Sequence, residues 1–120
     1  MTKNTDSVSL KDFVVEAIKE KKGKEIKVLD LRELDQSIAD YFIICHGDSN
    51  TQVDAISDFI DRQTRTELQE HVLHKEGTDN LQWVLLDYGE LVVHVFQEEF
   101  RRFYNLEDLW ADAKTELIED

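Results

Sequence analysis

Apolar residues recur at three- and four-residue spacing in three parts of the chain, the pattern of a helix with one buried face. These parts are residues 9–22, 49–68 and 105–117, and residues 98–103 begin a further helical stretch. Ser9 and Asn105 are the predicted N-terminal caps of the first and third helices. Ser49 with Gln52 forms a capping box for the second helix. Gly23 suits the left-handed backbone position that commonly follows a helix.

Four apolar runs of strand length lie between these helices, at residues 26–31, 41–45, 83–87 and 91–96. The last two are separated by Tyr88-Gly89-Glu90, and two such runs around a glycine turn predict a β-hairpin. Apolar and polar residues hardly alternate in this hairpin, so helices should cover both of its faces. We therefore expect the hairpin at the centre of a sheet, with Trp83, Asp87 and Tyr88 near one rim.

The order of these elements predicts an α/β fold, in which helices pack on a mixed sheet of about four strands. All four glycines stand at predicted element boundaries and the chain has no proline, so glycine provides the main chain breaks. One domain is expected over residues 1–120, with frayed ends at 1–6 and 115–120. Residues 69–81 show no clear period and are assigned no element.

The charge of the chain bears on the class of partner. With 27 acidic and 14 basic residues, the formal net charge is −13. Such a surface repels phosphate backbones, because nucleic-acid affinity depends on Lys and Arg replacing condensed counterions. A basic protein surface is the electrostatically better partner, and the charge should raise the association rate more than the final affinity. The competing interpretation is an acidic cytosolic protein whose charge serves no partner.

Three features indicate the compartment. No apolar run approaches the roughly 20 residues of a membrane span. Residues 1–8 lack the basic and apolar segments of a secretory signal. Cys45 is the one cysteine, so an internal disulfide is impossible and a reducing cytoplasm is the expected location.

The segment His46-Gly47-Asp48-Ser49 lies at a predicted strand-to-helix junction, where free backbone N–H groups favour anions. The segment has one glycine, Asp48 adds a negative charge, and Ser49 is explained as a helix cap. A cap is therefore favoured over a phosphate site. A nucleophilic serine would need a Gly-x-Ser-x-Gly context, but the residue two beyond Ser49 is Thr51.

Metal-ligating residue types occur in two patterns, and neither is specific. His71 and His74 are three residues apart beside two glutamates, but the cysteine and histidine partners of a zinc site are missing. Three aspartates at or near strand ends are candidates for a magnesium site if the fold brings them together: Asp30, Asp40 and Asp87. Cys45 is predicted to be a core residue and His94 a structural one, in the core or at a rim.

Large aromatic side chains serve either core packing or partner binding. Trp110 lies on the apolar stripe of the third helix and is predicted to belong to the core. Trp83 and Tyr88 flank the hairpin near its entry and its turn, and Trp and Tyr are preferred anchors of protein interfaces. Both interpretations stay open for these two residues.

Three ordered blocks of the sequence resemble those of one family. Asp40–Ser49 is DYFIICHGDS, Trp83–Phe96 is WVLLDYGELVVHVF, and Arg101–Trp110 is RRFYNLEDLW. Together with the pair Glu76-Gly77, these blocks resemble the Iojap family of ribosomal silencing factors (RsfS) over residues 8–113. His46 stands where many members have threonine, while the rest of its block is intact.

The resemblance implies a nucleotidyltransferase-like fold without catalysis, in a cytoplasmic protein that often forms homodimers. It implies binding to a basic large-subunit ribosomal protein, number fourteen in the universal nomenclature, on the face that meets the small subunit. Occupying that face would block subunit joining and lower translation when nutrients are short. The residues that match the block associated with the ribosomal contact are Trp83, Leu85, Asp87 and Tyr88. The resemblance implies no catalytic residue, cofactor or metal, while the charge and the lack of an apolar span indicate no direct DNA partner and no membrane partner.

Two other functions stay open. A minimal nucleotidyltransferase-like, nucleotide-binding enzyme would use Ser49, Asp48 and Asp87 around magnesium. The enzymes of this fold hold metal and nucleotide with a Gly-Ser pair and paired carboxylates. Here Asp48 interrupts the pair and the later strand offers Asp87 alone, which leaves too few ligands for phosphoryl transfer. A dimerisation module, using the N-terminal helix or a free sheet edge, is the third option.

Overall fold

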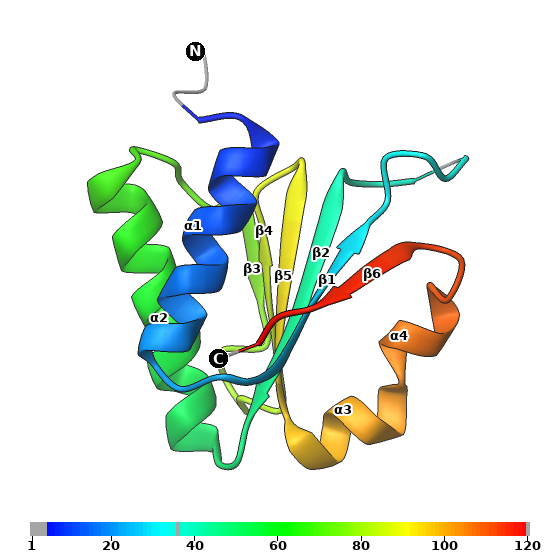
Figure 1. The fold of residues 1–120 in the computed structure, drawn as a ribbon. Coiled ribbons are helices and arrows are strands. Elements are labelled where there is room, and N and C mark those ends of the chain that lie inside the picture. Colours follow the sequence, from blue (N-terminus) through cyan, green and yellow to red (C-terminus); the bar gives the residue numbers. More distant parts are fainter. Residues whose placement is uncertain (1–4, 36, 120) are drawn as a thin grey trace.

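Six strands form one sheet in the part of the chain that the computed structural model describes, residues 5–35 and 37–119. In chain order the elements are α1 (Ser7–Glu20), β1 (Lys24–Asp30), β2 (Tyr41–Gly47), α2 (Asn50–Glu67), β3 (His74–Glu76), β4 (Trp83–Asp87), β5 (Leu91–Gln97), α3 (Glu98–Tyr104), α4 (Leu106–Leu109) and β6 (Lys114–Leu117). The strand order across the sheet is β3-β4-β5-β2-β1-β6. Figure 1 shows α1 and α2 on one face of the sheet and α3 and α4 on the other.

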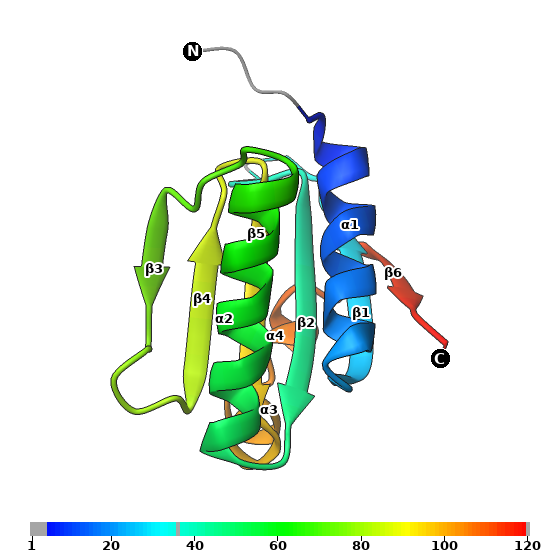
Figure 2. The same cartoon turned by 90° about the vertical axis from the view of Figure 1, so that its left-hand side faces the viewer.

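The parallel pair β2 and β5 forms the centre of the sheet, and the other neighbouring strands pair antiparallel. Every residue of β2 is buried, and so is every residue of β5 except Gln97. Because helices cover both faces here, neither strand needs polar residues at alternate positions. Figure 2 looks onto α1 and α2, which lie side by side over the central strands. The predicted α/β fold with a mixed sheet is confirmed.

The hairpin of β4 and β5 is also as predicted, with Gly89 in the turn at a φ of 93°. Its place in the sheet differs from the prediction, because only β5 is central. β4 lies one strand from the edge, and its residues alternate between half-buried and fully buried. One face of β4 is therefore only partly covered.

The two edge strands, β3 and β6, were not predicted. β3 consists of three exposed residues paired with β4, so it carries no apolar signal. β6 pairs with β1, and all four of its residues are exposed. Short polar strands of this kind are defined by pairing with a neighbouring strand, and for β6 that strand, β1, lies far away in the sequence.

The third predicted helix, over residues 105–117, was wrong in its second half. α4 ends at Leu109, and Ala113, on the predicted helical stripe, is instead a buried residue ahead of β6. Trp110 packs edge-on against Phe42 with ring centroids 5.4 Å apart, so its predicted place in the core is supported by this contact. Residues 115–118, expected to be frayed, continue along β1, where the backbone N–H of Ile118 donates to the carbonyl of Ile26 at 2.8 Å.

The helix ends differ from prediction at two caps. α1 is capped by Asp6, whose carboxylate accepts a hydrogen bond from the Ser9 N–H at 2.7 Å, and not by Ser9. Asn105 takes left-handed backbone angles between α3 and α4 and makes no side-chain cap hydrogen bond. None of the described helices combines the length and the apolarity needed to cross a membrane.

Gly23 follows α1 for a different reason from the predicted one. The left-handed conformation belongs to Lys22, at a φ of 64°. A Cβ on Gly23 would lie 2.3 Å from the Cγ2 of Ile18, so glycine is required by the close approach of this segment to α1.

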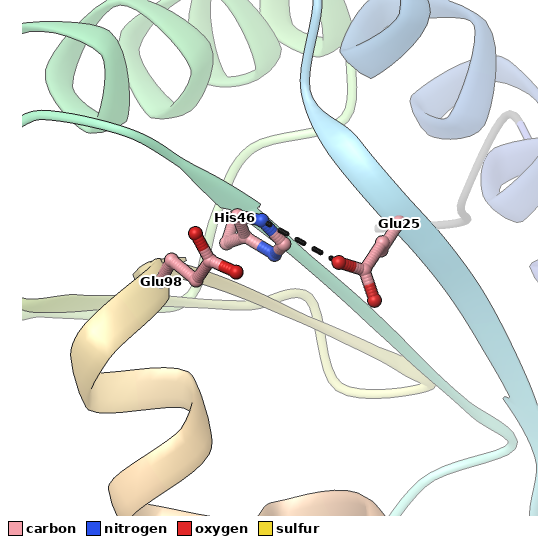
Figure 3. Close-up of side chains that lie close together, drawn as sticks. All are labelled: Glu25, His46 and Glu98. Carbon is pink, nitrogen blue, oxygen red and sulfur yellow. Dashed lines mark ion pairs between the residues drawn. The ribbon is translucent and has the colours of Figure 1, made fainter.

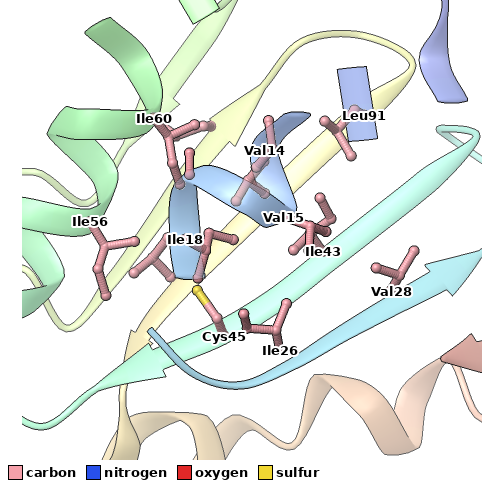
Figure 4. Packing of buried hydrophobic residues seen from close by; sticks show 14 of the residues in the cluster. Val14, Val15, Ile18, Ile26, Val28, Ile43, Cys45, Ile56, Ile60 and Leu91 are labelled. Carbon is pink, nitrogen blue, oxygen red and sulfur yellow. The ribbon is translucent and has the colours of Figure 1, made fainter. Parts of the chain in front are cut away.

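The larger apolar core lies between the sheet and the pair α1 and α2 (Figure 4). Ile18 of α1 and Ile56 of α2 meet Ile43 and Cys45 of β2 there, and all four side chains are fully buried. Full burial of an aliphatic side chain contributes about 1.5–3 kcal/mol. A second core, on the opposite face, packs α3 and α4 against β1, β2 and β5.

Candidate functional site

The half-covered face of β4 is a candidate contact surface, because it carries residues singled out from the sequence. Side chains alternate along a strand, so Val84 and Leu86 point into the core beneath α1 and α2. Trp83, Leu85 and Asp87 point to the opposite face and are half-buried. α3 contacts β5 and β2 on that face, which leaves β4 beside it only partly covered.

Trp83 is held in a fixed orientation by its neighbours. Its indole Nε1–H donates a hydrogen bond to Nδ1 of His94 at 3.1 Å. Its ring stacks on Phe96 with centroids 4.9 Å apart and leans on Tyr104 at 5.0 Å. Since the indole N–H is satisfied inside the protein, the part of Trp83 that remains accessible is apolar.

His94 belongs to the core, which answers the question left open by the sequence. Its side chain is 3% exposed, and burial lowers its pKa to about 3 because the charged form is poorly solvated there. The imidazole is therefore neutral at pH 7. Nδ1 accepts from Trp83, so the proton is on Nε2, which has no hydrogen-bond partner among the described residues.

Asp87 shares the face of Trp83 but lies at the other end of β4. Trp83 pairs with Phe96 and Asp87 with Val92, so roughly 13 Å of strand separates them. One carboxylate oxygen of Asp87 accepts the N–H of Gly89 at 2.7 Å and stabilises the hairpin turn. The expectation that Trp83 and Asp87 lie near one rim was therefore wrong, although both are on one face.

Tyr88 lies on the opposite face of the sheet. Its side chain is 1% exposed, and its hydroxyl is 2.8 Å from Oγ1 of Thr64 in α2. Burial raises its pKa to about 12. A ring buried under α2 has no surface to offer a partner, so Tyr88 serves as the link between the hairpin and α2. Tyr88 therefore does not belong to the half-covered face of β4.

One cluster that was not predicted has the residue types of a metal site. Ligand atoms of Glu25, His46 and Glu98 lie within 4.8 Å of one another, the one such group of three in residues 5–35 and 37–119 (Figure 3). Arg102 bonds both carboxylates, at 2.6 Å to Glu25 and 3.0 Å to Glu98. Arg101 donates to Nδ1 of His46 at 2.9 Å.

The positive charges of these two arginines balance the carboxylates of the cluster without a metal ion. The hydrogen bond from Arg102 lowers the pKa of Glu25. Burial, and then the charge of Arg101, lower the pKa of His46. A metal ion would face both guanidinium groups at close range, so we interpret the cluster as an ion-pair network that joins α3 to β1 and β2. The sequence carried no spacing that indicated it.

The junction before α2 is a helix cap, as predicted. Oγ of Ser49 accepts the N–H of Gln52 at 3.1 Å, and the Gln52 side chain accepts the N–H of Asp48 at 2.8 Å. The carboxylate of Asp48 pairs with Lys24 at 2.5 Å. The N–H groups of Asp48 and Gln52 are therefore already bonded within the protein.

The residues of the alternative enzyme site do not meet. Asp87 is level with Val92 and hence with Phe42, near the start of β2. Asp48 and Ser49 follow the end of β2, roughly 20 Å away at the length of six residues of strand. The sheet thus places Asp87 and the Asp48–Ser49 pair at opposite ends.

The remaining candidates are dispersed or buried. Arg32 donates two hydrogen bonds to the carboxylate of Asp30, which hold its pKa at about 2. Nε2 of His74 lies 2.6 Å from a carboxylate oxygen of Glu76. Neither belongs to a group of three potential ligands in the described part of the chain. Cys45 is completely buried, and burial raises its thiol pKa to about 12, which confirms the prediction of a core residue.

Comparison with known proteins finds one family along almost the whole chain. Residues 4–120 match the family model RsfS, described as "Ribosomal silencing factor during starvation". The ribosomal silencing factor RsfS of Bacillus subtilis is 41% identical over 108 residues, which are 88% of this chain and 87% of that protein. The RsfS of Halalkalibacterium halodurans is 39% identical over 110 residues, 92% of either chain.

A solved structure supports the fold. The crystal structure of a Chromobacterium violaceum protein superposes with a TM-score of 0.84 at 31% sequence identity. The superposition covers 97% of this chain and 95% of that one.

Proposed function

Because this chain belongs to the RsfS family of ribosomal silencing factors, we propose that it binds the large ribosomal subunit and keeps it from joining the small subunit. The family match over residues 4–120 is the observation that carries this proposal. The protein acts by occupying a surface, so it needs no cofactor and catalyses no chemical step. It works in the cytoplasm, where ribosomal subunits assemble into ribosomes.

The partner in this proposal is the basic large-subunit protein number fourteen, and the contact is the half-covered face of β4. Trp83 and Leu85 supply apolar area there, and Asp87 supplies a carboxylate for a Lys or Arg. The net charge of −13 favours a basic protein surface over exposed ribosomal RNA. Specific interfaces bury about 800 Å² on each partner, so other residues around β4 contribute as well.

Sedimentation tests the proposal directly. The protein is mixed with purified large subunits, and we expect it to migrate with them and to reduce the formation of whole ribosomes when small subunits are added. Co-migration without an effect on subunit joining would contradict the steric mechanism. Absence of co-migration at micromolar concentration would contradict the proposed function as a whole.

Trp83→Ala tests the position of the contact. Removing a central aromatic anchor typically costs about 2 kcal/mol or more, which is at least roughly a 30-fold loss of affinity. Leu85→Arg should also weaken binding, because it places a positive charge against a basic partner. Leu117→Ala is the matched control, since Leu117 is 55% exposed on β6 at the far edge of the sheet.

Circular dichroism and urea unfolding show whether each variant is folded. If folded Trp83→Ala and Leu85→Arg proteins bind subunits as tightly as the unchanged protein, the contact lies elsewhere on the molecule. If Leu117→Ala weakens binding equally, the effect is not specific to the face of β4.

Homodimer formation is a separate part of the proposal. The sheet ends in β3 on one side and β6 on the other, and each pairs with a single strand in the described part of the chain. Unpaired strand edges are common sites of self-association. Sedimentation equilibrium across micromolar concentrations measures the oligomeric state, and a constant mass of one chain, 14.1 kDa, would exclude the dimer there.

A further inference from the structure

A groove of about 240 Å³ opens between the β3–β4 connection and the end of α3. Its apolar lining comes from Trp83, Leu85 and Tyr104, and Glu76, Asn80 and Gln82 supply polar groups. Binding sites for small molecules usually measure about 300–1,000 Å³, so the groove suits one long side chain better than a nucleotide.

The aromatic part of the groove is rigid on one side and accessible on the other. On the side that faces the core, Trp83 is fixed by its hydrogen bond to His94 and by stacking on Phe96. Tyr104 leans on Trp83 with ring centroids 5.0 Å apart and is 50% exposed. No pattern in the sequence singles out Tyr104 as a surface residue.

The charge of the groove is negative. Glu76 is exposed, and its Oε2 lies 2.6 Å from Nε2 of His74. None of the described residues that line the groove is a Lys or an Arg. The whole protein adds a net charge of −13, so a cation is attracted both locally and at long range.

An arginine side chain matches these features. Its apolar stem packs along aromatic surface, its planar guanidinium stacks on aromatic faces, and its N–H groups bond carboxylates. We propose that the groove receives an arginine side chain of the basic protein on which this chain docks. This inference rests on the proposed function, since Trp83 and Leu85 belong to both the groove and the contact face. It adds Tyr104 and Glu76 to the residues that bind the partner.

The test uses a probe that does not depend on the ribosome. Nα-acetyl-L-argininamide is titrated into ¹⁵N-labelled protein, and the resonances of the Trp83 indole N–H and the Gly77 amide are followed. We expect saturable shifts, with no such shifts for the uncharged analogue Nα-acetyl-citrullinamide. Absence of shifts at tens of millimolar, or equal shifts with both compounds, would overturn the proposal.

Two pairs of variants connect the probe to subunit binding. Tyr104→Ala and Glu76→Gln should remove the arginine-dependent shifts and weaken large-subunit binding about tenfold, as expected for loss of a desolvated cation–π contact or a charged partner. Phe103→Ala is the control for the ring, since Phe103 is 77% exposed beside Tyr104 but does not line the groove. Asp79→Asn, in the same connection, is the control for the charge.

The outcomes separate this inference from the proposed function. If the unchanged protein binds subunits and Trp83→Ala weakens that binding, but Tyr104→Ala and Glu76→Gln do not, the groove proposal is wrong and the proposed function stands. If the unchanged protein does not bind subunits, the proposed function fails, and the arginine titration still decides whether the groove binds a guanidinium group.

Discussion

His94 and Trp83 connect the core of the protein to its proposed contact face. The imidazole of His94 packs edge-on against Phe42 at 4.7 Å, and its Nδ1 holds the indole of Trp83. This hydrogen bond requires an imidazole that is unprotonated at Nδ1. The orientation of a surface residue therefore depends on the protonation of a buried one.

The first prediction concerns pH. Burial lowers the pKa of folded His94 to about 3, whereas in the unfolded chain it is ordinary, near 6.5. Between these values the unfolded state binds a proton that the folded state does not, so the free energy of unfolding decreases as pH falls. The decrease should be up to about 2 kcal/mol between pH 6.5 and 5, before most carboxylates titrate. Urea unfolding at several pH values measures it.

His94→Leu is the variant that isolates this contribution. The variant loses the hydrogen bond to Trp83, which destabilises the protein by about 1 kcal/mol. It also removes the buried, unsatisfied Nε2–H, which stabilises the protein by about the same amount, so the free energy of unfolding at pH 7 should change little. The decrease between pH 6.5 and 5 should become smaller. An unchanged pH dependence in the variant would show that another group, such as His46, causes it.

At the scale of elements, α3 and α4 are joined to the sheet through one buried guanidinium. Arg101 is 1% exposed and donates to His46, to the carbonyl of Lys24 and to the carboxylate of Glu107. Its bonds therefore reach β2, β1 and α4. Its neighbour Arg102 is half exposed and pairs with surface carboxylates.

The second prediction compares these two adjacent arginines. Arg101→Ala should destabilise the protein by about 3–5 kcal/mol, because it leaves Nδ1 of His46 and the carbonyl of Lys24 without their donor and leaves Glu107 only its more distant ion pair with Lys27. Arg102→Ala should cost no more than about 1 kcal/mol, as is usual for exposed ion pairs. Urea denaturation of both variants measures the difference, and equal losses would contradict the structural role assigned to Arg101.

The third prediction concerns the connection between β3 and β4. Gly77 has a φ of 86°, and a Cβ there would lie 1.8 Å from the carbonyl oxygen of Trp83. Gly77→Ala should therefore displace the start of β4, cost at least about 1 kcal/mol of stability, and weaken large-subunit binding. Urea unfolding and sedimentation measure the two effects. A variant of unchanged stability and binding would mean that this connection adjusts without moving Trp83.

At the scale of the whole molecule, net charge governs encounter with the partner. The charge of −13 is spread over one small domain, and attraction to a basic protein acts over about 10 Å at 0.1 M salt. Such steering raises association rates by roughly ten- to a thousandfold, while final affinity depends on the packed contact.

The fourth prediction follows from this steering. At constant magnesium concentration, association with large subunits should slow at least about tenfold between 0.05 and 0.5 M potassium chloride, with a smaller change in dissociation rate. Stopped-flow fluorescence with labelled protein measures both rates. An association rate that does not depend on salt would contradict electrostatic steering.

The sequence by itself determined the elements whose signal is local. The periodic apolar residues of α1 and α2, the cap at Ser49 and the hairpin turn at Gly89 depend on residues close together in the chain, so each was predicted. The three family blocks were likewise contiguous. The left-handed conformation expected at Gly23 and the helix expected to continue after Leu109 were misassigned, because the same local pattern suits more than one backbone path.

Only the tertiary structure decided what depends on residues far apart in the chain. Strand β6 exists because β1 lies beside it, and the network of Arg101 with His46 forms because α3 returns to the end of β2. Packing also decided which hairpin residues face out: α2 buries Tyr88, while the limited reach of α3 leaves Trp83 partly exposed. Strand alternation separates these two side chains, but the cover over each face is set by elements distant in sequence.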